Sequence, residues 1–146
     1  MEPTIFADAA LCGALPLSGQ PVTMAVADGG ASTHVGGRIQ PGQYELVAAR
    51  GTTEGTWQSV LVFAESGAKR TQHQKLTISG FTSTSYESGK WSTSANQLTL
   101  STACSSEGST TIGDRTVKYS VRQEGCDVFL DIADDVTHFT YRRLHD

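Results

Sequence analysis

The chain has 146 residues, of which 38% are hydrophobic and 18% are charged, and its formal net charge is -4 at pH 7. That length is typical of one domain with a sizeable core. The Lys and Arg residues are scattered along the sequence, which argues against a nucleic-acid partner, because such binding depends on clustered cations that neutralise phosphates. No apolar run approaches the roughly 20 residues that a membrane-spanning helix needs.

The abundance of Ser, Thr and Gly favours a protein of short β-strands, since Thr tolerates the pleated backbone and Gly makes the turns. The same composition favours a location outside the cytoplasm. The apolar run from Ile5 to Leu17 is interrupted by Asp8 and lacks a basic start, so it is not a convincing signal peptide. Met1 either begins a leaderless chain or stands where an export signal was removed, and the composition favours the second. We therefore expect a secreted, periplasmic or lipid-anchored protein.

Residues 1–35 are predicted to form a partly irregular arm that packs on a barrel domain of residues 36–146. Val22, Met24 and Val26 are alternate residues, so the peptide 21–27 is predicted to be a strand or a wrapped arm. The stretch 28–37 is rich in Gly, Ser and Ala and is predicted to be a loop.

The first half of the barrel domain shows four candidate strands. Pro41-Gly42 predicts a type II turn, in which Gly supplies the positive φ, before a strand at 44–50. The next strand, 57–63, is apolar on both faces, which predicts that both sides are covered, for instance by the N-terminal arm. Strands follow at 72–79 and 81–86, and the residues 88–90 are predicted to be a turn.

The second half reads as a meander of four strands. Residues 91–94 pair with 97–102 across Ala95-Asn96, and alternating segments follow at 117–122, 128–132 and 136–144. This gives eight or nine strands with connections too short for parallel crossovers. Because closure removes unprotected edges, the sequence predicts an all-β, antiparallel up-and-down barrel of about eight strands, with a β-sandwich as the alternative.

Three cysteines allow one disulfide and leave one thiol over. Cys104 and Cys126 would close the excursion between two predicted strands. The alternative pair, Cys12 and Cys104, would attach the N-terminal arm to the barrel. A bridge over a loop the size of the Cys104–Cys126 excursion would stabilise the fold by about 3 kcal/mol.

Acidic and imidazole groups gather once in the sequence, at Asp131, Asp134, Asp135 and His138. Carboxylates and imidazoles suit hard or borderline cations, so this cluster is the best candidate for a metal site. A solvated turn at a strand edge is the more frequent explanation of such a cluster. No motif for zinc, nucleotide or nucleophilic catalysis is present, and we assign no metal, cofactor or catalytic residue.

Several phrases resemble a known group of proteins: "GGRIQPGQYELV", "LTISG", "GKWSTSANQLTLSTAC", "VKYSVRQEGCDVFLDI" and "FTYRRL". They are similar to small secreted bacterial proteins, most of them uncharacterised, and more broadly to lipocalin-like (calycin-type) barrels. That pattern has a Gly-x-Trp on an early strand and a basic residue on the last strand that packs over the Trp. Trp57 or Trp91 matches the first element, and Arg142 or Arg143 matches the second.

The resemblance implies that the barrel interior binds a small apolar molecule, as a barrel of eight strands can. The candidate ligand-binding residues are Tyr44, Leu46, Trp57, Leu76, Ile78, Trp91, Leu98, Tyr119, Tyr141 and Arg142. One alternative is a protein-interaction or inhibitor module that uses the barrel loops. Another is a small barrel enzyme such as a cyclase, although binding is favoured over catalysis. We expect a monomer or a weak dimer.

Overall fold

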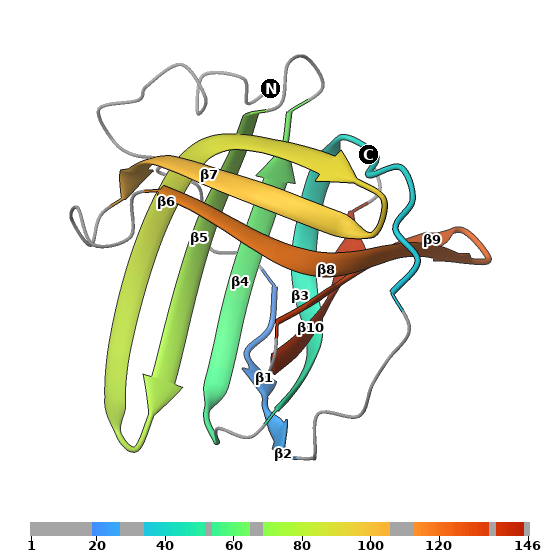
Figure 1. Ribbon diagram of the computed structural model, residues 1–146. Helices are drawn as coiled ribbons and strands as arrows, with labels where there is room; N and C mark the ends of the chain where they lie inside the picture. Colours follow the sequence, from blue (N-terminus) through green and yellow to red (C-terminus); the bar gives the residue numbers. More distant parts are fainter. Residues whose placement is uncertain are drawn as a thin grey trace.

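The computed structural model describes residues 19–26, 34–51, 54–64, 69–105, 113–134 and 137–144. All of its regular structure is β (Figure 1). The strands are β1 (Val22–Thr23), β2 (Ala25–Val26), β3 (Gly42–Gly51), β4 (Thr56–Phe63), β5 (Lys69–Ile78), β6 (Phe81–Ser94), β7 (Gln97–Ser105), β8 (Gly113–Glu124), β9 (Asp127–Ala133) and β10 (Thr137–Arg143). Within the described residues, no helix could cross a membrane.

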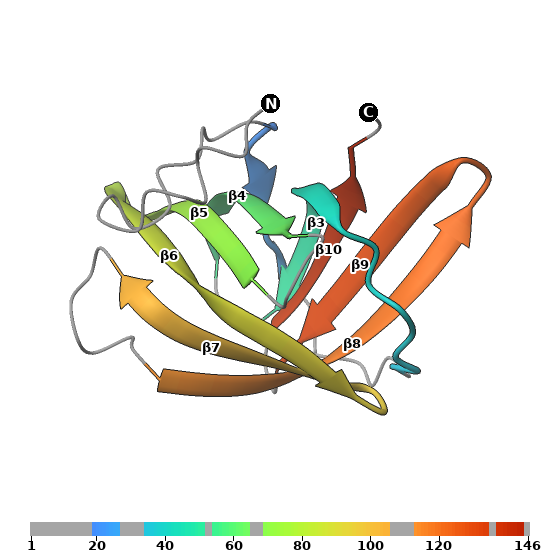
Figure 2. The ribbon, with the colours of Figure 1, turned by 90° about the horizontal axis from the view of Figure 1, so that it is seen from above.

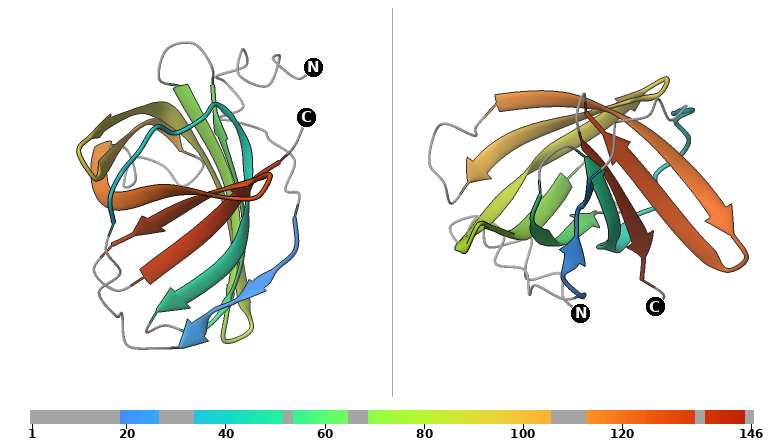
Figure 3. Two further views of the ribbon diagram at one scale, coloured as in Figure 1. Left: turned by 90° about the vertical axis from the view of Figure 1, so that its right-hand side faces the viewer. Right: turned by 90° about the horizontal axis from the view of Figure 1, so that it is seen from below.

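The eight strands from β3 to β10 form a closed ring. Each pairs with its neighbour in sequence in the antiparallel sense, and β10 pairs back with β3, so the first and last strands meet. Views from above (Figure 2) and from below (Figure 3, right) show how the sheet curls around a common interior. The prediction of an antiparallel up-and-down barrel is therefore confirmed.

The N-terminal segment completes one seam of this ring. β3 and β4 pair directly only between Gly42–Glu45 and Val60–Phe63. Beyond that point the segment lies between them, with β1 antiparallel to β4 and β2 parallel to β3. Met24, at the centre of the segment, donates its backbone N–H to the carbonyl of Gly55 and is 4% exposed.

The core lies inside the ring and follows the alternation of each strand. Its buried members are Met24, Ile39, Tyr44, Leu46, Ala49, Trp57, Leu61, Phe63, Leu98, Leu100, Val117, Tyr119, Leu130 and Tyr141. Strand β4 is the exception to alternation, because the outward Val60 and Val62 are buried as well as the inward Leu61 and Phe63. The prediction that both faces of this strand are covered is confirmed.

The predicted turn at residues 88–90 is wrong. β6 runs without interruption from Phe81 to Ser94, with a bulge opposite Ser88 and Gly89 where the pairing with β7 shifts. Ser and Gly weaken a strand, but here both edges of β6 are hydrogen-bonded, by β5 and by β7, and this pairing outweighs local preference.

The proposed bridge between Cys104 and Cys126 is also wrong, because the two residues lie near opposite ends of β8. Cys104 lies beyond Thr102, which pairs with the first residue of β8, whereas Cys126 follows its last residue. At about 3.3 Å per residue that strand separates them by roughly 35 Å, far more than a disulfide allows. Cys126 is an exposed free thiol. Cys12, which the alternative pairing needs, lies outside the described residues.

Candidate functional site

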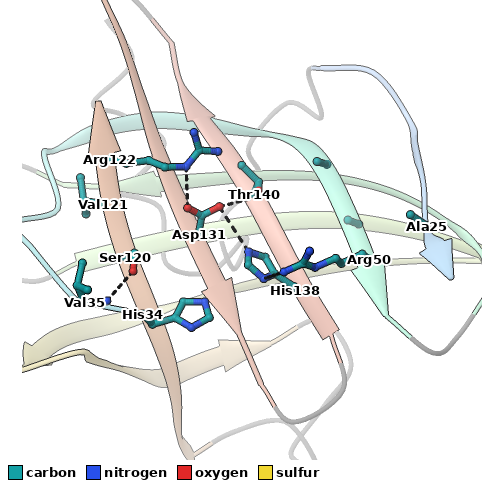
Figure 4. Close-up of a pocket in the computed structure, with 12 residues that line it drawn as sticks. Ala25, His34, Val35, Arg50, Ser120, Val121, Arg122, Asp131, His138 and Thr140 are labelled. Carbon is teal, nitrogen blue, oxygen red and sulfur yellow. Dashed lines mark hydrogen bonds and ion pairs between the residues drawn. The ribbon is translucent and has the colours of Figure 1, made fainter. Parts of the chain in front are cut away.

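A cleft of about 600 Å³ lies on the outer face of the barrel wall, over β8, β9, β10 and β3 (Figure 4). We call it the outer cleft. Its lining residues are Ala25, His34, Val35, Ala48, Ala49, Arg50, Ser120, Val121, Arg122, Asp131, His138 and Thr140. A volume of this size is in the range of small-molecule sites.

One wall of the outer cleft exists because β8 extends beyond the start of β7. Gln97, the first residue of β7, pairs with Lys118, whereas β8 continues to Glu124. Past Asn96, the edge of β8 is taken by the segment 34–37, through Gly36 N–H to the Tyr119 carbonyl and Val121 N–H to the Gly36 carbonyl. The Val35 N–H donates to Ser120 Oγ at 2.7 Å. These bonds fix His34 and Val35 beside the outer face.

The opposite wall is formed by β2 and β3. Ala25 lies opposite Arg50 in the parallel pairing of these strands, so both residues face the outer cleft. The N-terminal segment therefore supplies part of the site as well as part of the barrel wall.

Asp131 of β9 is the centre of the polar network in this cleft. Its Oδ1 accepts a hydrogen bond from Thr140 Oγ1 at 2.7 Å and a long one from His138 Nε2 at 3.5 Å, and its Oδ2 accepts from Arg122 Nε at 3.0 Å. The donors reach it from both neighbouring strands, because Asp131 is paired with Ser120 of β8 and with Thr140 of β10.

This network holds Asp131 in its charged form. Burial works to raise the pKa of the carboxyl group, but the hydrogen bonds from Thr140 and Arg122 and the charge of Arg122 outweigh burial, so the pKa lies below its usual value. Conversely, burial works to lower the pKa of Arg122, and the contacts with Asp131 and Glu124 raise it.

His138 has both ring nitrogens committed. Arg50 Nη2 lies 3.2 Å from Nδ1, and because arginine can only donate, Nδ1 is the acceptor and the ring proton lies on Nε2, facing Asp131. Burial lowers the pKa of His138, the charges of Arg50 and His34 lower it further, and the opposing contact with Asp131 does not compensate. His138 is therefore held neutral.

His34 covers His138 from the segment 34–37. The two ring centroids are 5.3 Å apart with the planes at 45°. Asn96 Nδ2 donates to the His34 carbonyl at 2.9 Å and fixes its backbone. Its ring Nε2 is buried without a hydrogen-bond partner. Such an atom is costly in a folded protein and calls for an explanation, such as a bound water, ion or ligand.

Two members of the acidic cluster in the sequence do meet here. Asp131 and His138 face each other across neighbouring strands, but arginine side chains hold them. Asp134 accepts the Thr137 N–H in the turn after β9, and Asp135 lies outside the described residues. The described residues contain no group of three or more acidic, His or Cys side chains placed to hold a metal ion.

The predicted ligand-binding residues lie elsewhere, inside the barrel. Tyr44, Leu46, Trp57, Leu98, Tyr119 and Tyr141 are buried in the core, and Leu76, Ile78 and Trp91 pack against it. The structure brings these nine together, whereas Arg142 is exposed on the outer face, opposite Glu45 of β3. Arg143 packs over Pro41 and Gly42, and its Nε donates to the Pro41 carbonyl.

The described interior side chains fill space by contacting one another. Phe63 makes edge-on contacts with Tyr44 and Trp91, at centroid distances of 5.6 and 5.1 Å. Tyr141 shares a hydrogen bond with Ser59 at 2.9 Å. Burial raises the pKa of Tyr44 and of Tyr141 to about 12, so both phenols are neutral at any physiological pH.

The sequence pointed to Asp131 and His138 but not to the other polar residues of the outer cleft. His34, Arg50, Ser120 and Arg122 occupy loop or outward strand positions, where polar residues are the norm. The signal that joins them is the pairing register, which places Arg50 opposite His138 and Ser120 opposite Asp131.

No protein-family model, curated protein or solved structure matches this chain.

Proposed function

We propose that the protein binds a small molecule, and that the ligand lies in the outer cleft and not in the barrel interior. The observation that carries this proposal is a cleft of about 600 Å³ whose polar groups are already held in place around Asp131. Preorganised polar groups beside apolar surface are typical of small-molecule sites. Ala48 and the 72% exposed Val35 supply the apolar surface.

The interior is the weaker candidate. Its described aromatic side chains already contact one another, and the inward-facing Leu98, Leu130 and Tyr119 are fully buried. A barrel of eight strands is just wide enough for side chains to fill it.

Binding is favoured over catalysis because of His138. A general base needs a free lone pair directed at its substrate, and both nitrogens of this ring are taken, by Arg50 and Asp131. Ser120 Oγ, the hydroxyl nearest the segment 34–37, already accepts the Val35 N–H.

The test is a fragment screen followed by amide-resolved NMR. We expect hits to perturb the amides of residues 34–36, 120–122 and 138–140, and to leave those of the interior strand positions near Leu98 unchanged.

Filling the cleft by Ala48→Phe is expected to weaken binding at least tenfold, because residue 48 faces the cleft. The matched control is Ser92→Phe on the exposed outer face of β6. Perturbation confined to the interior, or full binding by Ala48→Phe, would contradict the proposal.

A second candidate, docking to a protein partner, is favoured by one residue. Phe81, at the end of the long hairpin of β5 and β6, is 82% exposed. Exposed aromatic side chains often anchor interfaces. If this is its role, Phe81→Ser should abolish capture of a partner from the native source while leaving the free energy of unfolding unchanged, whereas a partner retained by Phe81→Ser would dismiss it.

A further inference from the structure

Positive side chains dominate the wall of the outer cleft. Arg50 and Arg122 bring guanidinium groups to it, and the imidazole rings of His34 and His138 lie in the same wall. Asp131 is the acidic residue among the lining side chains, is 9% exposed and already accepts three hydrogen bonds. A cationic ligand would therefore find the carboxylate occupied, whereas an anion meets several donors.

The contact between Arg50 and His138 is the place where an anion can enter. In the ligand-free protein it joins a charged donor to the lone pair of a neutral ring, over 3.2 Å. When the ring is protonated, both sides of this contact become cationic donors, and an acceptor between them satisfies both.

We infer that the ligand carries a carboxylate that binds between Arg50 and His138 with the uptake of one proton, an inference that rests on the proposed small-molecule function. One carboxylate oxygen accepts from the Arg50 guanidinium. The other accepts from protonated Nδ1 of His138, whose Nε2–H remains on Asp131. The proton comes from solvent, and no covalent bond is made or broken. The apolar part of the ligand lies against Ala48 and Val35.

His34 provides a further donor for the same group. Its ring lies 5.3 Å from that of His138, and its Nε2 is buried without a partner. A carboxylate at this position offers an acceptor to the ring once it turns, and so removes the cost of the unsatisfied atom.

The charges around His138 set the pH dependence. Arg50 from β3 and His34 from the segment 34–37 oppose its protonation, while Asp131 from β9, itself paired with Arg122 from β8, favours it. In the free protein burial and the positive groups prevail and keep the pKa of His138 low. A bound carboxylate adds negative charge beside Nδ1 and raises that pKa, so by linkage its affinity should rise by up to about tenfold for each pH unit below neutral.

The experiment compares two probes of the same shape, 3-phenylpropionate and its neutral amide. Binding is measured by calorimetry at pH 7 and pH 6, in buffers of different ionisation enthalpy, which gives the number of protons taken up. We expect the acid to bind at least about tenfold more tightly than the amide at the lower pH, with uptake of close to one proton.

Variants separate this inference from the proposed function. Arg50→Gln and His138→Gln should each remove the preference for the acid, while Arg142→Gln, which removes an exposed charge of β10 outside the cleft, should retain it. Equal binding of acid and amide in the cleft overturns the carboxylate and leaves the small-molecule function standing. An acid preference that persists in His138→Gln, or no proton uptake, overturns the proposed contact. Failure of both probes to perturb the cleft at millimolar concentration overturns the carboxylate inference, while the fragment screen decides the small-molecule function.

Discussion

Single residues of the outer cleft contribute to the stability of the fold. Asp131 is nearly buried and is the acceptor that organises Thr140, Arg122 and His138. Its replacement leaves these donors without a common acceptor, and a buried donor without its partner is unfavourable.

We expect Asp131→Asn to lower the free energy of unfolding by about 1–3 kcal/mol, because the amide presents one acceptor oxygen where the carboxylate presents two. Urea unfolding measures this change. Glu124→Gln is the matched control, since Glu124 pairs with the same Arg122 at the exposed surface, where an ion pair contributes about 0–1 kcal/mol. Equal losses in the two variants would contradict a special role for Asp131.

The lowered pKa of His138 predicts a loss of stability in mild acid. The unfolded chain takes up a proton on this residue at about pH 6.5, before the folded protein does, so its contribution is full above that pH and is lost as the pH falls through the lower folded pKa. Asp131, whose folded pKa is also lowered, loses its contribution only below about pH 4. The unfolding midpoint of the wild type should therefore fall between pH 7 and pH 5 by more than that of His138→Gln. Parallel profiles would contradict this assignment.

At the scale of single residues, the sequence predicted which side chains point inward, but not which outward side chains contact one another. Tyr44, Leu98 and Tyr141 were placed in the core by alternation alone, because burial follows the period of two. Arg50 and His138 are 88 residues apart in sequence, and only the closure of β10 on β3 brings them into contact. Alternation carries no information on such register.

In individual strands, too, some features follow from the local sequence pattern and others depend on pairing with neighbouring strands. The positive φ expected of Gly42 is observed, but at 143° it differs from the roughly 80° of a type II turn, and Gly42 is already the first residue of β3, so the predicted turn is wrong. The lengths of β6 and β8 were underestimated, because Ser88-Gly89 and the polar start of β8 look like turns when read without their neighbours. Pairing on both edges decides such segments.

The length of β8 has a consequence for the cysteines. Because Cys126 lies at the exposed turn between β8 and β9, we expect it to react with a thiol reagent in the native protein without denaturant. Cys126→Ser should change the free energy of unfolding by less than about 0.5 kcal/mol, whereas loss of a structural disulfide would cost about 2–5 kcal/mol. A native protein in which this thiol does not react would contradict the separation of Cys104 and Cys126.

On the scale of the whole molecule, closure of the barrel depends on the N-terminal segment. The short pairing of β3 with β4 leaves part of the seam to β1, Met24 and β2. The prediction of an irregular arm came from composition, and the alternation of Val22, Met24 and Val26 left a strand and a wrapped arm open. A local sequence pattern does not show where such a short strand docks, because its docking place is the gap that forms where β3 and β4 diverge.

We expect Met24→Ala to lower the free energy of unfolding by about 2–4 kcal/mol, since it removes a buried side chain from the centre of the seam. Thr23→Ala, at the exposed neighbouring position, should change it little. Because Ala25 of the same segment lines the outer cleft, Met24→Ala should also weaken ligand binding. A variant with a lower free energy of unfolding but unchanged ligand binding would show that the seam and the cleft are independent.

The same seam predicts a route by which two copies of the protein could exchange a strand. Removal of residues 22–26 would uncover the parts of β3 and β4 that do not pair with each other. The backbone amides and carbonyls along these two facing edges would then have no strand between them. The natural filler is the corresponding peptide of another copy, which already has the side chains and hydrogen-bonding register for that slot. Reciprocal exchange would give a closed pair, and head-to-tail exchange would give an open polymer.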